Sequence, residues 1–277
     1  MRTIIAEDTG FCFGVNRALE MALREISKNE KVYTLGELVH NKTVVESLKQ
    51  KGVKVIEDDI PEDARDSVLI IRAHGVPEED IKKAKESFKK VVDTTCPIVL
   101  NLFKIGQQMH RSGYRVFIFG KKDHPEMKAL LSYVPTALIT TEPVVLDEKS
   151  CILSQTTMSV EEFNNFVSCS LQISVYRELH VINTICDVTA RRERETKKIS
   201  QESDLVIVLG GKNSSNTSKL AKIASKITKV VHIEDPSEVE KIDLSGINTI
   251  GIVTGTSTPK EDLEILTEKI LHRRERK

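Results

Sequence analysis

The chain has 277 residues and a hydrophobic content of 39%, enough for one large domain or for two or three small ones. Lysine plus arginine and aspartate plus glutamate both number 41, and this zero net charge excludes nucleic acid as the main partner. No apolar run of about 18 residues and no secretory leader pattern occurs, and the five cysteines include no Cys-x-x-Cys pair. The sequence therefore predicts a soluble, cytoplasmic protein with neither a membrane span nor a disulfide framework.

The apolar periodicity predicts an alternation of strands and helices along the whole chain. Strands are expected at 3–6, 31–35, 53–56, 68–71, 91–92, 116–119, 151–153, 181–182, 205–209 and 249–253. Helical patterns begin near residues 15, 44, 77, 97, 126, 160, 187, 220 and 259. Such an alternation is typical of an α/β fold with small, mostly parallel sheets.

Three cysteines share one local context. Cys96 follows an apolar run and Asp93-Thr94-Thr95, and Pro97 then opens a helical pattern at the position where a missing N–H costs nothing. Cys12 and Cys186 stand in a similar strand–turn–helix setting, each with an Asp-Thr or Asn-Thr pair just before it. A helix N-terminus favours a thiolate over a thiol. The recurrence predicts three similar α/β units at 12–95, 96–185 and 186–277, with the N-terminal strand 1–11 joining the third.

Polar residues follow the strands in each predicted unit. Because ligands bind outside the carboxyl ends of parallel strands, three units with these edges facing inward would enclose a single site. The residues at these strand ends are Cys12, His40 and His74, then Cys96, 124–126 and Thr156, then Cys186, 214–216 and Ser257.

Three thiolates fit either an iron–sulfur cluster or a zinc ion. A four-iron cluster with three cysteine ligands keeps one iron without a protein ligand, an open Lewis-acid position that can also pass electrons. Cys151 and Cys169 lack the turn context and are expected to be small buried hydrophobic residues.

The remaining donors suit a phosphate group. Histidine, serine and asparagine side chains at strand ends, next to helix N-termini, form anion sites. Glu126, two residues beyond His124, is either a proton donor at such a site or a first-turn carboxylate that stabilises its helix.

Two other interpretations are compatible with the residues alone. One is a zinc-dependent phosphohydrolase, in which three cysteines and a water surround the metal. The other is a redox-sensing or phosphate-binding module without an enzymatic activity. Metal analysis separates the two enzyme interpretations, since a cluster brings about four irons per chain and the hydrolase one zinc.

The motifs together are similar to those of the LytB family of hydroxymethylbutenyl diphosphate reductases. The resemblance runs from Cys12 to the final helix and rests on 10–15, 36–41, Arg72-Ala73-His74-Gly75, 93–97, Asp123-His124-Pro125-Glu126, 154–157, 212–217 and 257–259. The one departure is an unusually charged run, 191–195, after Cys186.

The resemblance implies a fold, a cofactor and a reaction. The fold is a pseudo-threefold trefoil of three α/β units around one 4Fe–4S cluster, with Cys12, Cys96 and Cys186 as ligands and one open iron. The reaction is the reductive dehydroxylation of 4-hydroxy-3-methylbut-2-enyl diphosphate to isopentenyl and dimethylallyl diphosphate, the last step of the non-mevalonate isoprenoid route.

The resemblance also implies residue roles. Glu126 would deliver protons and Thr156 would hold the substrate hydroxyl. The diphosphate would be bound by His40, His74, His124, Ser214, Asn216 and Ser257, with Ser215 close by. Electrons would come from a donor such as a ferredoxin or a flavodoxin, and a basic run is expected either to dock that donor or to form a solvated helix face. This run contains Arg191, Arg192, Arg194, Lys197 and Lys198.

Overall fold

The computed structural model describes residues 2–29, 31–57 and 59–275. The twelve strands in this part of the chain form three four-stranded sheets, and every pair of neighbouring strands is parallel. Three small parallel sheets with helices are the α/β class that the sequence predicted. The described residues divide into two compact units: unit 1 takes the ranges 2–13, 40–44 and 187–275, and unit 2 takes the described residues of 14–39 and 45–186.

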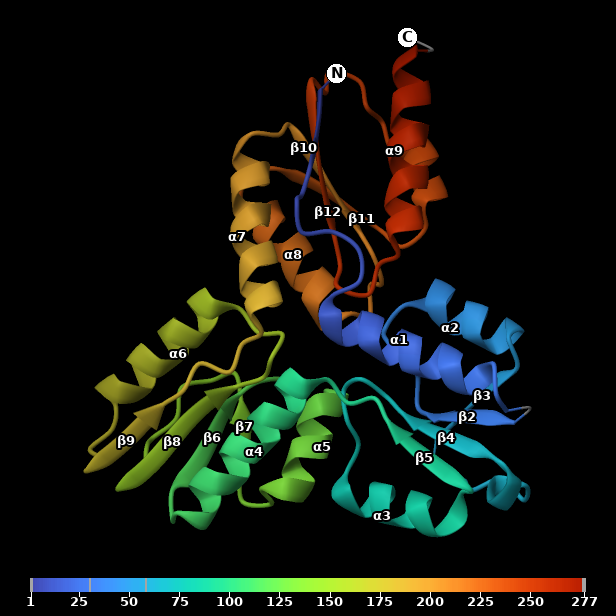
Figure 1. Ribbon diagram of the computed structural model, residues 1–277. Coiled ribbons are helices and arrows are strands. Elements are labelled where there is room, and N and C mark those ends of the chain that lie inside the picture. Colours follow the sequence, from blue (N-terminus) through green and yellow to red (C-terminus); the bar gives the residue numbers. More distant parts are fainter. Residues whose placement is uncertain (1, 30, 58, 276–277) are drawn as a thin grey trace. The chain divides into compact units, whose positions relative to one another are not determined.

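Unit 1 is built on the sheet with strand order β1-β12-β10-β11 (Figure 1). Its elements are β1 (Arg2–Ile5), α7 (Asp187–Gln201), β10 (Leu205–Leu209), α8 (Ser215–Ser225), β11 (Lys229–Ile233), η2 (Pro236–Lys241), β12 (Thr249–Thr254) and α9 (Lys260–Glu275). β10 is buried on both faces, because Val206 and Val208 pack under α7 and α8 while the alternate residues pack under α9. A strand that is covered on both faces has apolar residues at every position, which explains why β10 is recognisable in the sequence.

Unit 2 contains the other two sheets. The first has the order β3-β2-β4-β5 and the second β7-β6-β8-β9. The elements around the first are α1 (Phe13–Ile26), β2 (Val32–Leu35), α2 (Lys42–Gln50), β3 (Val53–Ile56), η1 (Ala64–Asp66), β4 (Val68–Ile71), α3 (Glu78–Ser87) and β5 (Lys90–Asp93). Those around the second are α4 (Pro97–Arg111), β6 (Arg115–Phe119), α5 (Pro125–Tyr133), β7 (Leu138–Thr140), β8 (Lys149–Ser154), α6 (Val160–Gln172) and β9 (Glu178–Val181).

The second sheet of unit 2 is also a two-faced core. Val116 and Ile118 of β6 pack with α4 and α5, while Phe117 and Phe119 pack with α6. The loops that follow β6 and β8 therefore start from strands that are buried on both faces.

Two strands were absent from the sequence prediction. β7 has only three residues and an exposed Leu138, and β11 is an edge strand with an exposed Lys229, so neither has the apolar run of a buried strand. Two of the three sheets lie in one compact unit, and the three-unit boundaries at 95/96 and 185/186 stay a prediction. Within the described ranges, no helix combines the length and the hydropathy that a membrane crossing requires.

Candidate active site

The three repeat cysteines lie in loops of the same construction. Each has a backbone N–H that donates, at 2.9 Å, to the carbonyl of the residue two positions beyond a central strand. The pairs are Cys96 with Ala73 after β4, Cys186 with Thr156 after β8, and Cys12 with Thr256 after β12. All three lie outside any disulfide bond and are of intermediate exposure. Cys96 is the N-cap of α4, with Pro97 in its first turn, as the sequence predicted.

A threonine two residues before the cysteine holds two of these loops. The hydroxyls of Thr94 and Thr184 donate to the carbonyls of the last residues of β4 and β8. Gly10 stands at the matching place before Cys12, with a φ of 76°. The Asp-Thr pair of the first loop, Asp8-Thr9, lies one residue further from its cysteine than the pairs of the other two loops do.

The thiols are divided between the two units. Cys12 belongs to unit 1, whereas Cys96 and Cys186 belong to unit 2. Within neither unit do three His, Cys, Asp or Glu side chains of the described residues lie together as metal ligands. The chemistry of these residues nevertheless suits an iron–sulfur group, because each is a cysteine outside any disulfide, on a hydrogen-bonded loop directly before the start of a helix.

The other two cysteines differ from these three and from each other. Cys151 is fully buried in β8, and burial raises the pKa of its thiol to about 12, so it stays protonated as expected of a core residue. Cys169 is exposed on α6, which corrects the expectation that it is buried. Neither lies in a strand–turn–helix loop.

Glu126 and Thr156 form a buried pair in unit 2. The N–H of Thr156 donates to one carboxylate oxygen of Glu126 at 2.8 Å, and its hydroxyl donates to the other at 2.7 Å. Glu126 is 1% exposed, and burial raises its pKa from 4.5 to about 7 against the opposing effect of the two Thr156 bonds. A carboxyl group with this pKa can hold and release a proton at neutral pH.

Thr156 and Thr157 are adjacent in the chain but have different partners. The hydroxyl of Thr157 accepts a hydrogen bond from Gln155 Nε2 at 3.0 Å, and it is Thr156 that contacts Glu126. Both threonines lie in the turn after β8, so their hydrogen-bond partners distinguish them rather than strand alternation.

Two of the predicted histidines are neighbours in unit 2. The rings of His74 and His124 lie 5.7 Å apart between centroids, at an interplanar angle of 82°. His124 is the N-cap of α5, and its Nδ1 accepts the N–H of Glu126 at 3.2 Å. A neutral ring that accepts at Nδ1 carries its proton on Nε2, so His124 is a donor on its other side.

Three more predicted residues lie at the N-terminus of α8 in unit 1. Ser214 is the N-cap of this eleven-residue helix and accepts the N–H of Thr217 at 3.3 Å, and Ser215 is its half-buried first residue. Asn216 is 2% exposed, and among the residues that the structure describes neither its Nδ2 nor its Oδ1 has a hydrogen-bond partner. An unpaired buried amide costs about 1–3 kcal/mol, so its presence at a helix N-terminus points to an anionic ligand.

His40 and Ser257 meet close to the same helix. The Ser257 hydroxyl donates to the backbone carbonyl of His40 at 3.1 Å. Gly211, in the loop between β10 and α8, approaches this carbonyl so closely that a Cβ there would lie 2.9 Å from it. Unit 1 thus brings His40, Ser257 and the start of α8 into one group of loops at the carboxyl edge of its sheet.

The structure also shows residues that the sequence analysis did not single out. Arg17 of α1 donates from Nη1 to the carbonyl of Thr95 at 3.2 Å, and so helps to fix the loop before Cys96. Gln155 is fully buried, and its Oε1 accepts the N–H of Lys121 at 2.9 Å. Nothing in the local pattern marks Arg17, because its partner is distant in the sequence.

One residue of the basic run on α7, Arg192, is buried. Arg192 is 2% exposed and donates to two backbone carbonyls, so it cannot belong to a surface that docks an electron donor. Arg191, Arg194 and Lys198 are exposed, and Lys197 is half-buried.

The sequence as a whole matches the family model described as "LytB protein" over residues 3–271. The chain belongs to the LytB family. A relative from Pseudothermotoga lettingae, named 4-hydroxy-3-methylbut-2-enyl diphosphate reductase, is 56% identical over 278 residues and the match covers 100% of both chains. A relative of the same name from Thermotoga maritima is 44% identical over 271 residues, covering 98% of this chain and 96% of the relative.

Two solved structures are similar to this chain over nearly its whole length. One, of (E)-4-hydroxy-3-methyl-but-2-enyl diphosphate reductase, matches with a TM-score of 0.71 and 34% identity, over 98% of this chain and 100% of the other. Another, from Plasmodium falciparum, has a TM-score of 0.85 at 24% identity, over 96% of this chain and 87% of the other, and supports the fold alone. Membership of the LytB family implies an iron–sulfur cofactor.

Proposed function

We propose that the chain removes the allylic hydroxyl of 4-hydroxy-3-methylbut-2-enyl diphosphate as water and yields isopentenyl and dimethylallyl diphosphate. The full-length relatives bear the name of this reductase, and the solved relative is described as the terminal enzyme of the non-mevalonate pathway. The net reaction takes up two electrons and two protons. One proton leaves with the hydroxyl group as water, and the other is added to carbon.

The observation that carries the proposal is the threefold cysteine loop. Cys12, Cys96 and Cys186 would hold one 4Fe–4S cluster, in which one iron has no protein ligand. When bound, such a cluster supplies electrons and an open Lewis-acid position. The support is that the backbone N–H of each cysteine donates to the same kind of carbonyl beyond a central strand, while the sulfur takes part in no disulfide.

The diphosphate would be bound by the histidine, serine and asparagine donors at the strand ends: His40, His74, His124, Ser214, Ser215, Asn216 and Ser257. The buried, unpaired amide of Asn216 supports this role, since a phosphate oxygen would supply the partner it lacks within the described residues. The N-terminus of α8 adds a favourable dipole for the same charge.

Glu126 would deliver protons, and Thr156 would hold the substrate hydroxyl beside it. The support is their direct pairing and the raised pKa of the Glu126 carboxyl, which keeps it about half protonated near pH 7. Anchoring of the distant diphosphate would keep the reacting end of the substrate in a fixed orientation to this carboxyl.

The electrons would come from a small carrier such as a ferredoxin or a flavodoxin. Arg191, Arg194 and Lys198, which are exposed on α7, are the candidates for its docking surface. We place the reaction in the cytoplasm, because the five cysteines form no disulfide, as is usual in a reducing compartment.

The test is anaerobic purification followed by metal analysis and a turnover assay. We expect about four irons and four sulfides per chain, and consumption of a strong one-electron reductant that depends on the allylic diphosphate, with both products found by mass spectrometry. One zinc per chain together with release of inorganic phosphate would instead establish the hydrolase interpretation.

A further inference from the structure

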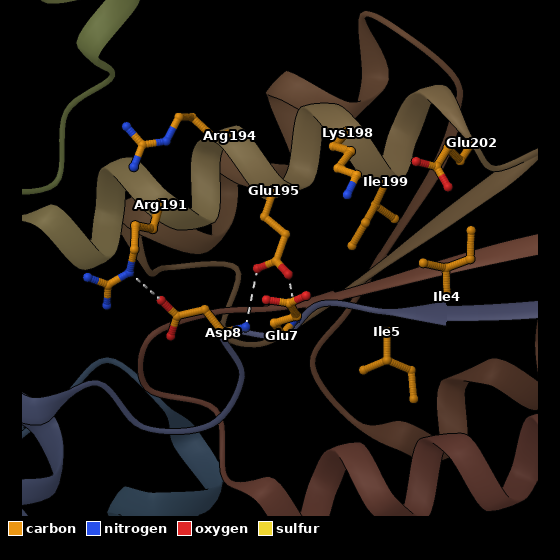
Figure 2. Close-up of a pocket in the computed structure, with 10 residues that line it drawn as sticks. All are labelled: Ile4, Ile5, Glu7, Asp8, Arg191, Arg194, Glu195, Lys198, Ile199 and Glu202. Carbon is orange, nitrogen blue, oxygen red and sulfur yellow. Dashed lines mark hydrogen bonds and ion pairs between the residues drawn. The ribbon is translucent and has the colours of Figure 1, made fainter.

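Helix α7 holds the loop that leads from β1 to Cys12 (Figure 2). Arg191 Nε lies 3.1 Å from Asp8 Oδ2, and the carboxylate of Glu195 accepts the N–H groups of Glu7 and Asp8. These side chains line a groove of about 570 Å³ beside β1. Much of the charged run after Cys186 therefore contacts a single loop of unit 1.

Arg192 makes the most buried of these contacts. Its Nη1 donates to the carbonyl of Thr254 at 3.0 Å, and its Nη2 donates to the carbonyl of Gly10 at 2.7 Å and lies 3.6 Å from Asp8 Oδ1. A buried charge is costly unless it is paired and hydrogen-bonded. Nη1 and Nη2 of the buried guanidinium have these partners, whereas Nε has none within the described residues. Both carbonyls belong to segments that flank Cys12 and its partner Thr256.

The contact to Thr254 has a counterpart in the other two cysteine loops. Thr254 is the last residue of β12, and at the last residues of β4 and β8 the carbonyl accepts from a threonine hydroxyl instead. Before Cys12 the place of that threonine is taken by Gly10, whose φ of 76° disfavours a β-branched residue. Arg192 reaches the same type of carbonyl from helix α7.

We infer that Arg192 is a positioning residue that holds Cys12 in place as a cluster ligand. It makes the hydrogen bond to the end of the strand that a threonine makes in the other two loops, and Glu195 holds the same loop through the N–H groups of Glu7 and Asp8. Because α7 begins directly after Cys186, one helix is covalently continuous with one proposed ligand and hydrogen-bonded to the loop of another. The cluster part of this inference rests on the proposed function, whereas the hold on the loop does not.

Hydrogen–deuterium exchange on the metal-free protein tests the hold on the loop. In Arg192→Gln the amide of Cys12 should exchange at least tenfold faster, because the loop loses its charge-assisted bonds. The amide of Cys96 makes the same kind of bond in a loop held by its own threonine, and it should keep its wild-type rate. An unchanged Cys12 amide, or equal acceleration at both cysteines, would overturn the inference.

If Arg192→Gln does not fold, the hold of α7 on the loop is tested with Glu195→Ala, and Arg194→Ala serves as the matched control. Glu195→Ala removes the acceptor for Glu7 and Asp8 at the groove and should accelerate the exchange of these two amides about tenfold. Arg194→Ala removes an exposed charge from the same helix and should leave the loop unchanged. Equal exchange in Glu195→Ala and Arg194→Ala would contradict the proposed hold.

The loaded protein tests the link to the cluster. Arg192→Gln should release iron to a chelator about tenfold faster than wild type and alter the electron paramagnetic resonance spectrum of the reduced cluster, and Arg192→Lys should recover most of the loss. If the Cys12 amide exchanges faster in Arg192→Gln but the variant retains iron and has the same spectrum as wild type, the link between Arg192 and the cluster is rejected. If the wild type binds no cluster, the proposed function fails, while the exchange rates still decide whether Arg192 holds the loop.

Discussion

Replacement of Glu126 by glutamine tests the proton-transfer step with little change in shape. The pKa of the Glu126 carboxyl is raised by burial from 4.5 to about 7, so its protonated fraction falls from about one half at pH 7 to about one tenth at pH 8. A reaction that needs this proton should lose kcat/KM in the same proportion across that interval. Glu126→Gln should lower turnover by about 10²–10⁴, equivalent to about 3–5 kcal/mol of barrier, and keep substrate affinity.

The assay is a pH series of kcat/KM with a chemical reductant for wild type, Glu126→Gln and Thr157→Val. Thr157 is the matched control, because its hydroxyl bonds Gln155 and not Glu126. The substrate's own titration is common to all three proteins, so the ratio of wild type to Glu126→Gln isolates the carboxyl. A glutamine variant with turnover within threefold of wild type, or a ratio that does not fall above pH 7, would refute the assignment.

Three further substitutions have separate expected outcomes. Thr156→Val removes a bond that lowers the pKa of Glu126, so this pKa rises and the alkaline decline of kcat/KM should move to higher pH; a shift to lower pH would contradict this. Asn216→Ala should not lower the free energy of unfolding by more than about 1 kcal/mol, because no bond within the described residues is lost, and should weaken diphosphate binding by about 1.5–3 kcal/mol in calorimetry; loss of stability with unchanged affinity would assign the amide to the fold. Ser257→Ala should weaken the same binding by about 1.5–3 kcal/mol, and equal affinities would remove it from the site.

Much of the fold could be predicted because buried parallel strands leave a plain signal. β4, β6, β10 and β12 are apolar on both faces, so the sequence shows each as an uninterrupted run. The start of α4 could also be predicted, since proline is favoured in the first turn of a helix and disfavoured in its interior. β7 and β11 gave no such signal, because one is short and both border a single strand.

The site was predictable where local patterns carry it. Glu126 and Thr156 were chosen from separate motifs, and the structure places them in contact. The role of Arg192 could not be predicted in this way. In the sequence it is one charge among several, and only the fold shows that its side chain, unlike those of Arg191 and Arg194, lies buried against the carbonyls of Gly10 and Thr254.

The central claim is that three particular thiols bind one iron–sulfur cluster, and the direct measurement is iron and sulfide per chain in a set of cysteine-to-serine variants. The account predicts about four irons in wild type and in the controls Cys151→Ser and Cys169→Ser, and loss of the intact cluster in Cys12→Ser, Cys96→Ser and Cys186→Ser. Full iron content in any of these three, or equal loss in the exposed Cys169→Ser control, would contradict it.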